Sequence, residues 1–118
     1  MGGERAKWLK ESKRRCDDAL KSSRAFFRPL LPEAIRLKGT YEWLRRRPAA
    51  AEKWWNRSLS LADKMGMPYH SGLAHLDIGR RLNDRAHLEQ AEAFFRRVGA
   101  EWDLAETQRL LEANRGSG

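Results

Sequence analysis

The side chains able to do metal or acid–base chemistry are few in this chain of 118 residues, and their spacing keeps them apart. The histidines are His70, His75 and His87. On a helix, the five-residue step from His70 to His75 turns the two side chains about 140° from each other, and Asp77 points in a further direction. We therefore expect no metal site and no cofactor.

Nucleophilic and carboxylate chemistry is equally poorly supported. Cys16 is the only cysteine, and although Arg14 and Arg15 favour its thiolate, no histidine lies nearby in the sequence. Glu89 and Glu92 fall on one solvated helix face, whereas catalytic carboxylates need burial to separate their pKa values. The sequence has no GxxxxGK[ST] phosphate loop. We expect a structural thiol at Cys16 and no enzymatic activity.

Aromatic and basic side chains are plentiful by comparison, with five tryptophans in the chain. Most aromatic residues should pack between helices. Neighbours on a helix point about 100° apart, so one member of each pair, Trp54–Trp55 and Phe94–Phe95, should face outward. An exposed tryptophan is a natural anchor for a partner. Basic clusters that suit carboxylates follow at Lys13–Arg15, Arg45–Arg47 and Arg80–Arg81.

The net charge of +8 is unevenly distributed. Residues 1–66 carry +9 and residues 67–118 carry −1. The basic half could attract phosphates, acidic lipids or an acidic protein, and a solvated basic surface is the simpler interpretation. A lone cysteine and the lack of a long apolar run predict a cytoplasmic protein that does not engage a membrane.

The elements that position these side chains should all be helices. Charged residues make up 34% and hydrophobic residues 41% of the chain, and β-branched residues are scarce. Pro32, Pro48 and Pro68 suit helix starts, while Gly66 and Gly99 suit left-handed ends. The predicted helices are 5–27, 32–46, 48–65, 68–82, 84–98 and 100–113. Their predicted inward faces include Met65, Tyr69, Val98 and Trp102.

Two stretches of the chain nearly superimpose. Residues 51–57, AEKWWNR, recur at 91–97 as AEAFFRR, and a glycine lies twelve residues before each, at Gly39 and Gly79. A second match relates residues 64–69 to residues 97–102. Such self-similarity predicts a short antiparallel helical-repeat solenoid of about six helices. We expect a basic N-terminal helix at 1–28, a repeat domain at 29–114 and a disordered tail at 115–118.

The repeated positions resemble tetratricopeptide repeats, in which a glycine, a small residue and an aromatic recur at this spacing. The series is Gly39, Ala51 and Trp55, then Gly79, Ala91 and Phe95. The resemblance implies that the glycine and alanine allow two helices to approach closely and that the aromatic fills space towards the next unit. Glu42 departs from the motif, which has an aromatic at that position.

Residues 28–112 further resemble the C-terminal repeat region of large bacterial signalling proteins that carry a nucleotide cyclase, kinase or DNA-binding head and a central ATPase. The segments that carry this similarity are 55–62, 65–69, 72–75, 87–91 and 95–100. The resemblance implies an ATPase-associated tail with a regulatory, protein-binding role and without nucleotide hydrolysis.

Taken together, these patterns predict a non-enzymatic protein–protein interaction module of bacterial signalling. The expected ligand is an acidic peptide segment in a groove lined by the first helices of the repeats. Terminal repeats leave apolar faces uncovered, so the chain should be either only marginally stable or self-associating. The alternative is a nucleic-acid-binding accessory protein that uses the basic N-terminal half. The partner-binding residues predicted for the groove are Arg36, Lys38, Arg80 and Trp54.

Overall fold

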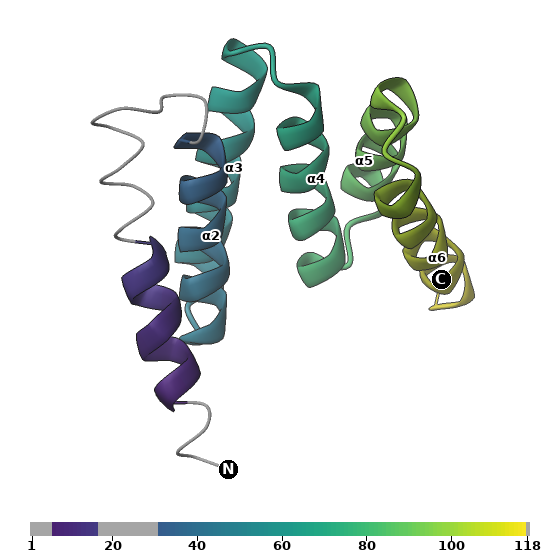
Figure 1. The fold of residues 1–118 in the computed structure, drawn as a ribbon. Coiled ribbons are helices and arrows are strands. Elements are labelled where there is room, and N and C mark those ends of the chain that lie inside the picture. Colours follow the sequence, from purple (N-terminus) through teal and green to yellow (C-terminus); the bar gives the residue numbers. More distant parts are fainter. Residues whose placement is uncertain (1–5, 17–30, 118) are drawn as a thin grey trace. The chain divides into compact units, whose positions relative to one another are not determined.

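The computed structural model describes residues 6–16 and 31–117, and these residues form helices without any strand. The all-α prediction is therefore confirmed. The chain divides into two compact units, residues 1–58 and residues 59–118. After the helix of residues 6–16 come α2 (Leu31–Leu44), α3 (Pro48–Lys64), α4 (Pro68–Leu82), α5 (Arg85–Val98) and α6 (Glu101–Ser117) (Figure 1).

Local sequence explains where these helices begin and end. Pro48 and Pro68 each occupy the first position of a helix, where a missing N–H costs nothing. Gly66 and Gly99 follow α3 and α5 with φ of 64° and 73°, a left-handed conformation that glycine adopts freely. Asp84 caps α5, because its side chain accepts a hydrogen bond from the His87 backbone N–H at 3.2 Å.

Two turns use a non-glycine residue in the left-handed conformation. Arg46 has φ of 62° between α2 and α3, and Asn83 has φ of 53° between α4 and α5. The first turn is closed by backbone hydrogen bonds from Arg46 N–H to the Trp43 oxygen at 2.9 Å and from Arg47 N–H to the Glu42 oxygen at 3.0 Å. Arg46 is the costlier of the two, because asparagine tolerates this conformation better than a long side chain does.

In the first unit, α2 and the first part of α3 pack against each other at very short range. A Cβ on Gly39 would lie 2.5 Å from Cδ1 of Trp55, so only glycine leaves room for the fully buried indole. Near the start of α2, the buried Ser58 hydroxyl donates to the Pro32 carbonyl oxygen at 2.6 Å. Ala34, Tyr41 and Ala51 are also buried.

In the second unit, α4 and α5 form an antiparallel pair held by two glycines. A Cβ on Gly79 would lie 2.7 Å from Cγ of Leu88, and one on Gly72 would lie 2.8 Å from Cε1 of Phe95. The core consists of Leu76, Leu88, Ala91, Phe95 and Leu111, the last contributed by α6. The α4–α5 turn is tied to the end of α6, where Asn114 Nδ2 donates to Asn83 Oδ1 at 2.8 Å.

Some predicted helix boundaries differ from the structure. The predicted repeat domain, 29–114, stays a prediction, and it spans parts of both compact units. Helix α6 continues to Ser117, through most of the predicted tail, aided by the Glu112–Arg115 ion pair at 3.9 Å. The predicted first helix, 5–27, is described only at residues 6–16, and the rest lies outside the described residues.

The two glycines of the repeated series both lie where two helices approach closely, but they face different side chains. Gly39 lies against Trp55. The structure places Gly79 against Leu88 and brings Gly72, seven residues earlier, against Phe95. The reason is the turn: α4 ends three residues after Gly79, whereas α2 ends five residues after Gly39. Trp55 and Phe95 fill space inside their own helix pairs rather than only towards a neighbouring unit.

Candidate functional site

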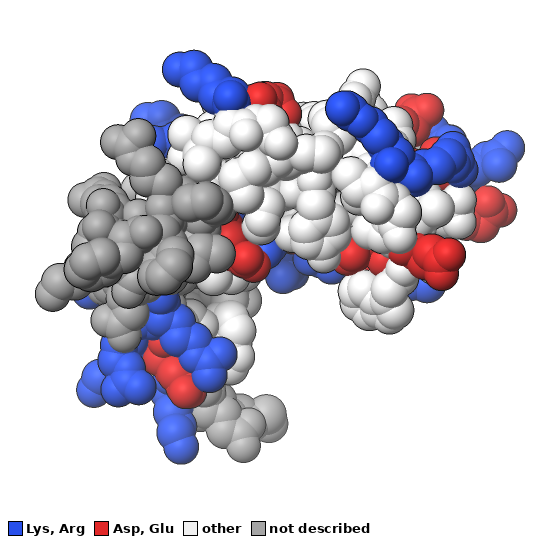
Figure 2. All heavy atoms as spheres, turned by 45° about the horizontal axis from the view of Figure 1, so that its top comes forward, with Lys and Arg blue, Asp and Glu red and all other residues white. Residues whose placement is uncertain are grey.

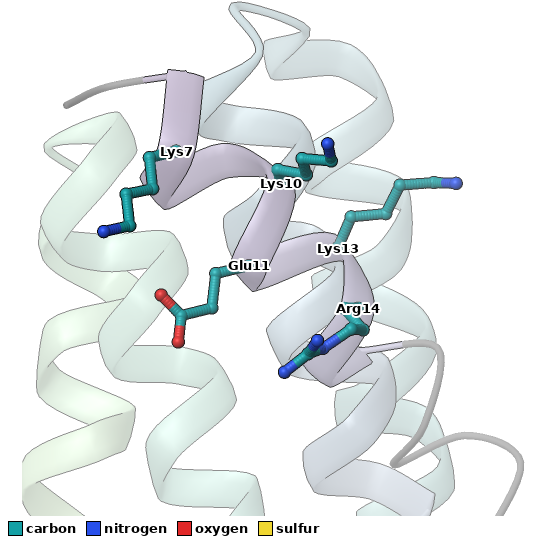
Figure 3. A pocket seen from close by; sticks show the side chains of 5 residues that line it. All are labelled: Lys7, Lys10, Glu11, Lys13 and Arg14. Atoms are coloured by element: carbon teal, nitrogen blue, oxygen red, sulfur yellow. The ribbon is translucent and has the colours of Figure 1, made fainter. Parts of the chain in front are cut away.

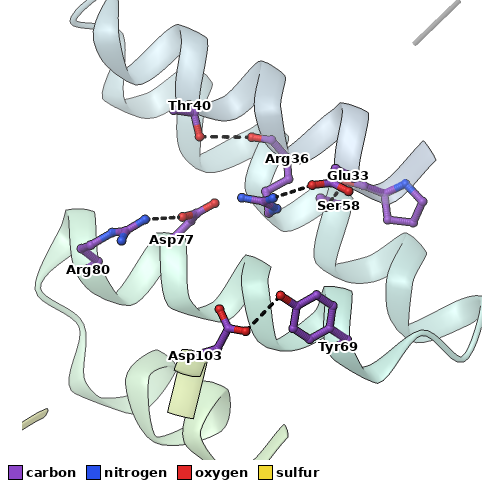
Figure 4. Close-up of polar contacts among 9 residues, drawn as sticks. Glu33, Arg36, Thr40, Ser58, Tyr69, Asp77, Arg80 and Asp103 are labelled. Atoms are coloured by element: carbon purple, nitrogen blue, oxygen red, sulfur yellow. Dashed lines mark hydrogen bonds and ion pairs between the residues drawn. The ribbon is translucent and has the colours of Figure 1, made fainter. Parts of the chain in front are cut away.

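The predicted partner-binding cations of the first unit are mostly buried and already paired. The Arg36 side chain is 14% exposed and its Nη2 donates to Glu33 Oε1 at 3.1 Å (Figure 4). The Lys38 side chain is 18% exposed, with Nζ 4.0 Å from Glu42 Oε1. Neither residue presents the solvent-facing charge that the sequence led us to expect.

The two other predicted contacts are more accessible. Arg80, in the second unit, donates from Nη2 to Asp77 Oδ1 at 2.9 Å (Figure 4). Trp54 is half-buried, and the Arg57 guanidinium lies over its ring, 5.5 Å from the centroid. Trp54 is the more exposed member of its aromatic pair, since Trp55 is fully buried, and Phe94 and Phe95 divide in the same way.

Four side chains predicted to point inward are exposed instead. They lie at one end of the second unit, where α3 and α5 end and α4 and α6 begin. Trp102 is 79% exposed and Tyr69 is 38% exposed. All four lie within about one turn of a helix end. We call this group the apolar edge: Met65, Tyr69, Val98 and Trp102.

The apolar edge is held in place by specific contacts. The Tyr69 hydroxyl donates to Asp103 Oδ2 at 3.0 Å, which links the first turn of α4 to the first turn of α6 (Figure 4). The Tyr69 ring lies 5.9 Å from the buried Phe95 ring. Lys64, Arg96 and Arg97 are exposed nearby in sequence, at the ends of α3 and α5. Aromatic surface on a fixed backbone, next to cations, is typical of a protein-binding surface.

A second feature is the α2–α3 turn of the first unit, where one carboxylate serves three cations. Glu42 is buried, and its carboxylate lies 3.7 Å from Arg45 Nη1 and 3.8 Å from Arg47 Nη1, in addition to Lys38. These separations are longer than hydrogen bonds, so the guanidinium donors keep capacity for other acceptors. Cations here also complement the negative end of the α2 dipole.

Next to this cluster is an apolar depression of about 490 Å³, lined by Trp43, Leu44, Arg46 and Pro48. Trp43 is half-buried, and its ring lies 5.9 Å from that of Trp55. The depression was not predicted, because it depends on how α2 and α3 meet. The only sequence signal was the aromatic and basic composition of residues 43–47 beside Pro48.

The helix of residues 6–16 carries the third feature, a surface depression whose described lining residues are mostly cations. Figure 3 shows its lining side chains extending from this helix, and basic side chains dominate the corresponding lower-left part of Figure 2. One acidic residue is included. Such a cluster suits a polyanion or an acidic protein surface. The lining residues are Lys7, Lys10, Glu11, Lys13 and Arg14.

The structure brings together two histidines that sequence spacing left apart. His75 Nδ1 and His87 Nδ1 lie 2.8 Å from each other across α4 and α5, and the His75 ring stacks on Phe94. Burial, and to a smaller extent His87, lower the pKa of His75 to about 4. The Nδ1 atoms face each other as a hydrogen-bonded pair, so they are not arranged to share a metal ion.

The remaining candidates for chemistry stay separate. The part of the chain that the structure describes holds no group of three or more metal-ligating side chains. Cys16 is buried. Glu89 and Glu92 lie beside Arg85 and Arg96 at 3.8 and 3.6 Å. Among the described helices, none has both the length and the apolar character to cross a bilayer.

Comparison with known proteins gives no relative from which a role could be transferred. The chain matches no protein-family model, no curated protein and no solved structure.

Proposed function

We propose that this chain is a non-enzymatic protein-interaction module, built from tetratricopeptide-like helix pairs, that acts in the cytoplasm in bacterial signalling. The observation that carries the proposal is the apolar edge of the second unit, where Trp102 is 79% exposed although the same unit buries Phe95 completely. A large aromatic side chain held in water on an ordered helix is costly to leave uncovered. Covering it gives a partner most of its binding energy.

The helix pairs support the tetratricopeptide-like part of this proposal. Gly39 and Gly72 each allow an aromatic of the second helix to lie directly on the first, and Ala51 and Ala91 are fully buried. Small residues at the helix crossing and one buried aromatic per pair are what such repeats require.

The proposed partner carries carboxylates, because the chain has a net charge of +8. Arg80 and Trp54 remain candidate contacts for such a partner. Arg36 and Lys38 would act by holding Glu33 and Glu42 in place more than by direct contact. We expect affinity to fall as salt rises, because the exposed charges are screened.

The test is capture of a partner by the immobilised chain, followed by purification of that partner and a calorimetric titration. We expect saturable binding that weakens about tenfold or more in the Trp102→Ala variant. Trp8→Ala, which removes an exposed tryptophan from the first unit, is the matched control and should change the affinity little. If no captured protein binds saturably once purified, the proposal is wrong.

The cation-lined depression on the helix of residues 6–16 favours a second candidate function, a nucleic-acid-binding accessory role. On this alternative, random-sequence duplex DNA would bind with an affinity that drops steeply with salt. Replacing Lys7, Lys10 and Lys13 with glutamine would abolish the binding. Salt-insensitive or undetectable binding in a gel-shift assay would eliminate this candidate.

A further inference from the structure

We infer that the α2–α3 turn is the docking site for an acidic segment of the partner protein. In this arrangement an apolar side chain of the segment occupies the depression over Trp43, Leu44 and Pro48, and a neighbouring carboxylate pairs with Arg46. The inference rests on the proposed function, since it names the place on the first unit where an acidic partner is held.

The charge balance of the turn is the first argument. Arg45 and Arg47 share the buried carboxylate of Glu42 with Lys38, so one negative charge faces three positive ones. The Arg47 side chain is mostly exposed. Its guanidinium, with five N–H donors, therefore has donors free to meet a second carboxylate from solvent.

Arg46 is the second argument. It is exposed, and its guanidinium has no carboxylate partner among the described residues. Its backbone is held at φ of 62° by the hydrogen bonds that close the turn, which fixes the direction in which the side chain leaves. A long side chain in a conformation that suits glycine is a local cost, and such costs collect at functional positions.

The shape of the surface is the third argument. The depression of about 490 Å³ is walled by Trp43, Leu44 and Pro48, and Arg46 is the one charged residue among the described residues that line it. The Trp43 ring is steadied by Trp55 behind it, so the pocket is pre-formed. Compensation of the α2 dipole accounts for cations at this end of the helix. It does not account for the apolar side chains that line the depression beside them.

The experiment uses the full chain labelled with ¹⁵N and a short synthetic peptide that has one central leucine among aspartates and glutamates. Two matched peptides replace the leucine with serine or the acidic residues with their amides. We expect the Trp43 indole N–H and the Arg46 amide signals to shift and saturate with the leucine peptide. Each altered peptide should bind about tenfold more weakly.

The decisive variant is Arg46→Gly, because glycine relieves the backbone and the variant should melt no lower than the parent. Its affinity for the leucine peptide should fall about tenfold, whereas Arg46→Lys should lose only part of it. Arg115→Gln removes the same charge from the exposed end of α6 and should bind nearly as the parent does.

Three outcomes overturn the inference: no saturable shift at Trp43, equal binding of the serine peptide, or equal loss in Arg115→Gln and Arg46→Gly. Equal loss in the two variants would mean that the peptide is attracted by the net charge of the chain alone. Failure here is distinguishable from failure of the proposed function. If a purified partner binds the parent and the Arg46→Gly variant equally, the module still binds protein and only the docking site is wrong.

Discussion

His75 and His87 contact each other through their Nδ1 atoms, 2.8 Å apart, across the α4–α5 pair. One ring must donate and the other accept, so the contact requires at least one neutral imidazole. Burial is the main reason why the pKa of His75 is lowered to about 4, the charge on His87 adds to the effect, and Asp63 opposes it.

We therefore expect the second unit to lose stability as the pH falls. The unfolded chain keeps a histidine pKa of about 6.5, so between that pH and about 4 it binds a proton that folded His75 does not. The contribution of His75 to the free energy of unfolding is fully present above about pH 6.5 and declines as the pH falls towards 4. Because His75 is only partly buried, we expect a loss of about 1–2 kcal/mol, measurable by urea unfolding at several pH values.

The His75→Phe variant should flatten this pH dependence, because it keeps the ring stacked on Phe94 and removes the proton site. If the parent and variant curves have the same slope between pH 6.5 and 4, His75 does not carry the effect.

Gly39→Ala and Gly72→Ala should both destabilise the chain. Alanine normally favours a helix over glycine by about 1 kcal/mol. Here the new Cβ would lie 2.5 Å from Trp55 or 2.8 Å from Phe95, and overpacking of this kind costs about 1–3 kcal/mol. Lower midpoints in chemical denaturation are expected, and a gain in stability would show that the helix pairs are looser than described.

Ala51→Leu and Ala91→Leu should each cost about 1–3 kcal/mol, because both residues are fully buried. The control is Ala93→Leu, which lies on the exposed side of α5 two residues from Ala91. It should change the melting temperature little. Equal melts for all three variants would contradict the packing of both helix pairs.

Replacing two tryptophans with alanine should lower the stability of the chain by very different amounts. Trp55→Ala removes a fully buried side chain and should cost about 3–5 kcal/mol, while Trp102→Ala removes one that is 79% exposed and should cost less than about 0.5 kcal/mol. Thermal melts give this comparison directly. A large loss in Trp102→Ala would mean that this residue supports the fold and would weaken its assignment to a binding surface.

Arg46→Gly should stabilise the first unit by about 1 kcal/mol, because φ of 62° costs a residue with a β-carbon roughly that amount. Gly66→Ala and Gly99→Ala should lower the stability, because each puts a β-carbon on a residue with positive φ. A steric clash is not the cause, since nothing lies within 4 Å of a Cβ at either position. The urea midpoint should rise in Arg46→Gly and fall in the two alanine variants, and the opposite change in any of them would contradict this account.

Most of the helix boundaries could be predicted, because the signals that set them are local. Pro48 and Pro68 begin their helices, Asp84 caps α5, and Gly66 and Gly99 terminate α3 and α5 as their residue types indicate. The close contact at Gly39 also followed from the recurring glycine, alanine and aromatic positions.

The rest depends on which residues meet through space. Gly79 shares the sequence spacing of Gly39, but an earlier turn places it opposite Leu88. His75 and His87 meet for the same reason, since neither lies at a metal-ligand spacing in the sequence. Apolar periodicity likewise placed Tyr69 and Trp102 inside, because it cannot report how much of the first turn of a helix its neighbours cover.

The unequal distribution of tryptophans gives each unit its own optical reporter. Trp8, Trp43, Trp54 and Trp55 all belong to the first unit, which leaves Trp102 as the sole indole of the second. With its side chain in water, Trp102 should emit at long wavelength and be quenched readily by iodide, whereas Trp55 should be shielded. In a variant whose four other tryptophans are replaced by phenylalanine, the fluorescence of Trp102 would report directly whether a partner occupies the apolar edge.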